Sequence, residues 1–135
     1  MRKQIALFGI GALMLANDAF GEDAASKLPA ASDKKDVTYA SDIKAILDKS
    51  CVKCHSGEKP KAKLSLDTLE GALKGGKGKL IVPGKSAESP LVLNIAHLAK
   101  DQDKWMPPLH NKANIEPLTA EQIGLIRAWI DQGAK

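Results

Sequence analysis

The feature that most constrains this chain is the run Cys51-Val52-Lys53-Cys54-His55, which contains both of its cysteines. Residues at i, i+3 and i+4 share one face of a helical turn, so the two thiols and the imidazole can point the same way. Thiols placed in this way can bond two vinyl-derived carbons at the edge of a porphyrin while the imidazole reaches its iron. The C-x-x-C-H spacing therefore predicts one covalently attached haem c per chain, held by Cys51, Cys54 and His55.

The N-terminal segment has the pattern of an export signal. Arg2 and Lys3 precede an apolar run over residues 5–16, which is too short to span a bilayer. Ala19-Phe20-Gly21 then places small residues at the two positions that a signal peptidase reads. We expect cleavage after Gly21, export to a bacterial periplasm and no stable membrane anchor afterwards. The alternative is an uncleaved anchor or a fraying first helix, and Asp18 together with the shortness of the run argues against an anchor.

The oxidising compartment expected for this chain and its low content of aromatic residues both favour a cofactor bonded to the cysteines. Two exposed thiols in an oxidising compartment tend to form a disulfide unless something else claims them, and haem thioether bonds would do so. The 135 residues include only two Phe, two Trp and one Tyr, which are few large side chains for filling a core. A buried cofactor would help to fill it.

The helix expected before the motif turns its apolar face toward the core. Its stripe, at i, i+4, i+7 and i+8, consists of Tyr39, Ile43, Ile46 and Leu47. Thr38 or Ser41 can cap its start. Cys51 and Cys54 continue the stripe, so the helix delivers both thiols on its core-facing side. A thioredoxin-like C-x-x-C would begin a helix after a strand, and no strand is predicted before Cys51.

Three further short helices are expected, which makes the fold all-α with about four helices and long loops. Their expected N-terminal caps are Asp67 for a helix over 68–74, Ser89 for one beginning at Pro90, and Thr119 paired with Gln122 in a capping box. Loops this long in a small domain indicate an internal organiser, and a covalent haem would serve. The predicted organisation is a signal peptide over 1–21, a flexible lead-in over 22–36 and one domain over 37–135.

The face of the iron opposite His55 needs a donor or stays open. Met106 is the only methionine beyond the signal segment, and the two prolines that follow it stiffen the backbone. We expect Met106 to be the second axial ligand, with a role as a core gap-filler as the alternative. His97 and His110 compete for the same position. His97 lies one residue off the apolar stripe of its helix, at the edge or surface, and His110 lies in a polar loop.

This choice of ligands decides the chemistry. Methionine opposite histidine favours ferrous iron and raises the reduction potential relative to two histidines. With six ligands the iron has no place for a substrate, so we expect electron transfer and no enzymatic activity. The imidazole N–H of His55 also needs an acceptor that fixes its tautomer. The turn over residues 81–84 is the expected acceptor.

Positive charge gathers around the motif. Between residues 49 and 85 there are nine lysines and three acidic residues, while the whole chain carries a formal charge of +4. The charge either forms a solvated surface or steers the protein toward redox partners with acidic docking surfaces. Nucleic acid is not an expected partner, because the charge is modest and aromatic residues are nearly absent from the basic stretch.

With Cys51, Cys54, His55 and Met106 in place, the chain resembles class I c-type cytochromes, and more closely the planctomycete-type cytochrome c domain. The matching segments cover about residues 39–134 and are Asp42-Ile43 to Leu47, Cys51 to Gly57, Leu64-Ser65-Leu66-Asp67-Thr68, Gly75-Gly76, Ile81-Val82-Pro83-Gly84, Ser89-Pro90-Leu91, Met106-Pro107-Pro108, and Leu118-Thr119 through Trp129 to Ala134. The resemblance implies a small cytochrome c fold around one haem. His55 and Met106 would be the axial ligands, with the first and last helices crossing beside the haem.

The function that follows is a soluble periplasmic monohaem cytochrome c that passes electrons between a protein donor and a protein acceptor. One alternative is a haem protein whose sixth position is open or labile, acting as a sensor or in peroxidase-like chemistry. Another is a structural zinc module in which Cys51, Cys54 and two histidines bind the metal. The histidines His97 and His110 lie far from the usual zinc-ligand spacing.

Overall fold

The computed structural model describes residues 22–135, and this part of the chain is helical and contains no strand. The all-α prediction is therefore confirmed. The export signal predicted over residues 1–21 lies outside the described residues. Within 22–135, no helix has both the length and the apolar character needed to cross a membrane.

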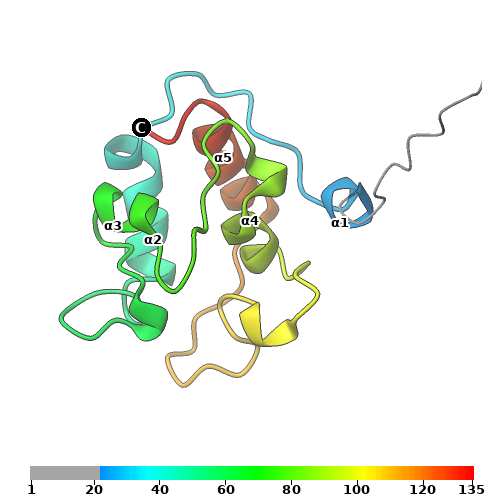
Figure 1. Cartoon of the computed structure of the whole chain (residues 1–135). Helices are drawn as coiled ribbons and strands as arrows, with labels where there is room; N and C mark the ends of the chain where they lie inside the picture. The colour runs from blue at the N-terminus through cyan, green and yellow to red at the C-terminus, as the bar shows by residue number, and fades with distance from the viewer. Residues whose placement is uncertain (1–21) are drawn as a thin grey trace, which may run out of the picture.

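Five α-helices and four shorter turns make up the described fold (Figure 1). The helices are α1 Glu22–Ser26, α2 Lys44–Ser50, α3 Leu69–Lys74, α4 Pro90–Ile95 and α5 Ala120–Asp131. A π-helical turn, Tyr39–Ile43, leads directly into α2, and 3-10 turns occupy Lys61–Lys63, Ser86–Glu88 and Gln102–Lys104. In Figure 1, α2 and α3 lie on one side of the domain, and α4 and α5 lie on the other. The four expected helices are present as α2 to α5, and α1 is an addition.

The predicted first helix consists of the π-helical turn and α2 together. Thr38 is its cap, because the Thr38 hydroxyl oxygen accepts a hydrogen bond from the Ser41 N–H at 3.2 Å. Ile43 and Leu47 are buried, as the apolar stripe predicts. The ring of Tyr39 packs against Trp129 of α5 with 6.1 Å between ring centroids, so the first and last helices meet at this end of the domain.

The other helices begin close to the N-terminal caps predicted for them, and the cap of α3 is shifted by one residue. The capping box of Thr119 and Gln122 at α5 is confirmed. At α3 the expected cap, Asp67, is wrong by one position. Thr68 has the extended backbone that brings its hydroxyl to the Gly71 N–H, at 3.0 Å, so the helix begins at Leu69. Ser89 precedes α4 as expected, but its buried hydroxyl donates to the Lys85 carbonyl at 2.9 Å instead of capping the helix.

The lead-in differs from the flexible segment that its composition predicts. From Leu28 onward it lies along α5, held by hydrogen bonds of Ser32 N–H to the Gly124 carbonyl (2.9 Å), Arg127 Nη1 to the Pro29 carbonyl, Gln132 Nε2 to the Lys34 carbonyl (2.7 Å) and Val37 N–H to Gln132 Oε1 (3.1 Å). Three of these bonds use a backbone group of the lead-in, and the fourth uses the backbone N–H of Val37, which directly follows it. Its polar side chains and lack of apolar periodicity therefore gave no sign of the contact.

Replacing Gly124 by alanine tests whether the lead-in lies against α5, because the sign of the change in the free energy of unfolding depends on that contact. A Cβ built at Gly124 would lie 2.5 Å from the Ala30 carbonyl oxygen of the lead-in. Alanine in a free helix surface would stabilise α5 by about 1 kcal/mol relative to glycine. With the lead-in docked, we expect Gly124→Ala instead to lower the free energy of unfolding by about 1–3 kcal/mol, the range typical of overpacking. Urea unfolding monitored by circular dichroism measures the change.

The matched control for Gly124→Ala is the same substitution in a chain that begins at Lys35. Removing residues 22–34 also removes the Ala30 carbonyl, so alanine at position 124 should there be neutral or stabilising. If Gly124→Ala stabilises the longer chain, the lead-in does not lie against α5.

Candidate functional site

The C-x-x-C-H run forms a turn of its own after α2 ends at Ser50. The Cys51 carbonyl accepts hydrogen bonds from the N–H groups of Cys54, at 3.1 Å, and His55, at 3.0 Å. These are the i+3 and i+4 bonds of one helical turn. Both cysteines are free thiols. The turn that the spacing predicts is therefore present, and it places Cys51, Cys54 and His55 on a single short piece of backbone.

Cys51 is the thiol that reaches inward. Its side chain packs against the buried core cluster, which contains Ile43 and Leu47 from the preceding helix. Burial raises the pKa of the Cys51 thiol to about 11. The raised pKa favours the protonated thiol over the thiolate, which is the reactive form of cysteine. The stripe prediction put both cysteines on the core side; it is confirmed for Cys51, whereas Cys54 is not among the side chains that pack against the core cluster.

His55 is oriented by a backbone carbonyl. Its Nδ1 lies 3.0 Å from the carbonyl oxygen of Lys61, in the 3-10 turn Lys61–Lys63. A carbonyl only accepts, so Nδ1 carries the proton and Nε2 is left with a free lone pair, as a ligating imidazole needs. The Lys61 N–H returns a bond to the Cys54 carbonyl at 2.9 Å. The motif and the 3-10 turn therefore fix each other.

The expectation that the turn over residues 81–84 would accept from His55 is thus wrong. In that turn the Val82 carbonyl accepts a hydrogen bond from the Lys85 N–H at 2.9 Å, and the Gly84 N–H donates to the Ile130 carbonyl of α5 at 2.7 Å. The Val82 N–H donates to the Ser89 hydroxyl at 3.0 Å. Any residue type supplies a carbonyl, so the sequence contained no signal for Lys61 in this role.

Met106 is held at its backbone. Its N–H donates to the Asn94 carbonyl of α4 at 3.0 Å, and its half-buried side chain packs against the same core cluster as Cys51. These contacts fix the backbone of Met106 against α4 and put its thioether beside the core. The role of Met106 as axial ligand stays a prediction.

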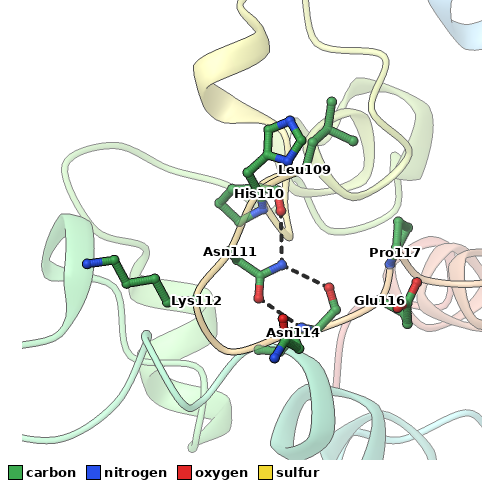
Figure 2. A pocket seen from close by; sticks show the side chains of 9 residues that line it. Leu109, His110, Asn111, Lys112, Asn114, Glu116 and Pro117 are labelled. Atoms are coloured by element: carbon green, nitrogen blue, oxygen red, sulfur yellow. Dashed lines mark hydrogen bonds between the residues drawn. The ribbon is translucent and has the colours of Figure 1, made fainter.

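His97 and His110, the two alternatives to Met106 as second axial ligand, lie in different environments from Met106. Nε2 of His97 lies 3.1 Å from the Pro107 carbonyl oxygen, so this nitrogen is the donor of a hydrogen bond. His110 is exposed. It lies in the loop over 108–117, which lines an open hollow of about 440 Å³ and is braced by the Asn111 side chain through bonds of 2.8 to 3.0 Å to the loop backbone (Figure 2). The lining of this hollow includes neither Met106 nor any residue of the C-x-x-C-H turn.

Sequence reasoning missed the contacts of His97 with the two residues that flank Met106. The imidazole of His97 stacks on the indole of Trp105, with 5.2 Å between ring centroids and 4° between ring planes. The spacing of one residue off an apolar stripe placed His97 at the helix edge but gave no partner. No sequence periodicity links the end of α4 to an irregular loop.

The donor set and its surroundings fit a haem. Two thiols and an imidazole with a free Nε2 occupy one turn, as covalent attachment and iron ligation require. Several apolar side chains pack on the core yet stay partly exposed: Ile46, Leu69, Leu73, Leu80, Leu93, Leu98 and Leu125, together with Cys51 and Met106. Within residues 22–135, no three His, Cys, Asp or Glu side chains gather into a group that could hold a metal ion.

Comparison with known proteins identifies the same motif region. The family model described as Planctomycete cytochrome C matches residues 51–110. The match begins at Cys51 and includes Cys54, His55 and Met106. No curated protein and no solved structure matches the chain.

Proposed function

Since this chain contains a planctomycete-type cytochrome c domain, we propose that it is a soluble monohaem electron carrier of the bacterial periplasm. A cytochrome c domain implies haem c, and two cysteines three residues apart fit its covalent attachment. The observation that carries the proposal is the bond between His55 Nδ1 and the Lys61 carbonyl, 3.0 Å long. It leaves Nε2 free for iron in the same turn as both thiols.

Each residue of the motif has a separate task. Cys51 and Cys54 would bond the macrocycle, Cys51 from the core side of the turn. His55 would present Nε2 to the iron, and the Lys61 carbonyl would hold its tautomer and ring orientation. Bound haem c supplies an iron that cycles between its ferric and ferrous states.

Met106 closes the opposite side in this proposal. Its N–H is anchored to α4 through Asn94, and the prolines after it restrict the backbone. A thioether opposite imidazole favours ferrous iron and raises the reduction potential. With His55 and Met106 both holding the iron, the centre would transfer electrons and would have no open position for a substrate.

Redox proteins are the partners of a cytochrome c domain in general. The lysines of the motif region support a more specific proposal, a partner with an acidic docking surface. Lys53, Lys61 and Lys63 are all exposed, and Lys61 is the residue whose carbonyl contacts His55. Opposite charge would speed the encounter of the two proteins more than it would tighten their complex.

Carbon monoxide binding tests the carrier against the open-site alternative. The holoprotein, made with the c-type maturation machinery, is reduced and exposed to carbon monoxide. A closed iron should show almost no change in its absorption spectrum within minutes, whereas an open or labile sixth position would give an immediate shift. Full carbon monoxide binding at once would reject the carrier and favour a sensor or peroxidase-like protein. A pyridine haemochrome assay on the same sample excludes the zinc module if haem is found.

A further inference from the structure

His97 occupies a backbone position that usually belongs to glycine. Helix α4 ends in a Schellman motif, in which the Leu98 N–H donates to the Leu93 carbonyl at 2.9 Å and the His97 N–H donates to the Asn94 carbonyl at 3.2 Å. His97 is the left-handed residue of this motif, with φ of 56°. Glycine is the residue that this position suits best, so a histidine here makes a difference mainly through the contacts of its imidazole.

The imidazole of His97 contacts the residues on both sides of Met106. Its Nε2 bonds to the carbonyl of Pro107, which follows Met106, and its ring stacks on Trp105, which precedes Met106. The indole N–H of Trp105 in turn donates to the Ala99 carbonyl at 2.9 Å, just past the end of α4.

Three links therefore attach the segment 105–107 to the C-terminal end of α4: the backbone bond from Met106 to Asn94, the indole bond of Trp105, and the bond from His97 to Pro107. Two of the three run through side chains. Bonds placed on both flanks of one residue restrict its backbone more than a single anchor does, so the Met106 side chain starts from a fixed place.

We propose that His97 and Trp105 clamp the segment around Met106 and that they are positioning residues for this axial ligand. The proposal rests on the proposed function, in which Met106 binds the iron. The clamp lowers the population of states in which the Met106 thioether has left the iron. Its removal should therefore make the sixth position more accessible to added ligands.

His97→Gly in the ferric holoprotein is the sharpest test. Glycine suits the left-handed position, so the fold should be retained or stabilised, and only the clamp is lost. Imidazole competes with Met106 for ferric iron, and its apparent affinity is measured by absorption titration. We expect about a tenfold tighter apparent affinity, as the loss of one hydrogen bond and one ring stack predicts. Thermal unfolding on the same sample checks the fold.

Three further variants make the result interpretable. His110→Gly removes an imidazole from the exposed loop nearby and should leave the affinity for imidazole unchanged. Trp105→Leu removes the stacked ring and its indole bond to the Ala99 carbonyl while keeping His97 at the end of α4, and it should raise the affinity as His97→Gly does. Met106→Ala removes the competing ligand altogether and should raise it most.

The results with these variants test the clamp separately from the assignment of Met106 as the axial ligand. If Met106→Ala tightens imidazole binding while His97→Gly and Trp105→Leu leave it unchanged, the clamp is refuted and the ligand assignment stands. If Met106→Ala leaves the affinity unchanged, Met106 is not the ligand, and the clamp proposal fails together with that assignment.

Discussion

Replacing Cys51 and Cys54 together by alanine should abolish covalent haem attachment. The two thiols lie in one helical turn, and the chain contains no other cysteine, so no thioether bond can form in the double variant. Wild-type protein made with the c-type maturation machinery should stain for haem on a denaturing gel and gain the mass of one haem. The double variant should show neither the stain nor the added mass.

Lys53→Ala is the matched control for the cysteine variants, because it changes an exposed residue inside the same turn and removes no bonding atom. It should stain like the wild type. Each single cysteine variant keeps one thiol and should lose a large part of the stain. Haem that stays attached through denaturation in the double variant would show that the C-x-x-C-H turn is not the attachment site.

Replacing Met106 by alanine should lower the reduction potential by about 100 mV or more, a modest part of the roughly 0.8 V range that haem axial ligands cover. The thioether stabilises ferrous iron, and alanine offers water or an added ligand in its place. Protein-film voltammetry of the holoprotein measures the potential directly. The haem itself should stay attached, since Cys51 and Cys54 are untouched.

Leu109→Ala controls for a general disturbance of this loop. Leu109 follows the same pair of prolines and is 60% exposed, so its truncation removes little packing. We expect its potential to match that of the wild type. Equal potentials in the wild type and Met106→Ala would instead assign Met106 to the core, as a gap-filling side chain.

The sequence predicted those parts of the structure that depend on side-chain type and period. The apolar stripe that contains Ile43 and Leu47 predicted the first helix, and its extension brought Cys51 to the core. The capping box at α5 was found because threonine and glutamine three residues apart complete each other's hydrogen bonds. The C-x-x-C-H spacing and the family match then point to the same residues.

Backbone groups explain most of what the sequence could not predict. The lead-in is bound to α5 through its own N–H and carbonyl groups, and His55 is oriented by the Lys61 carbonyl. Every residue has such groups, so composition carries no record of which ones pair. The contact of His97 with Trp105 and Pro107 depends on a left-handed turn after α4, and a histidine does not signal that turn.

The central claim is a six-coordinate iron with His55 and Met106 as its ligands, and the absorption spectrum of the ferric wild-type holoprotein tests it most directly. A thioether bound to low-spin ferric iron gives a weak band near the red end of the visible spectrum. We predict this band in the wild type. A bis-histidine spectrum without the band, or a high-spin spectrum, would contradict the claim.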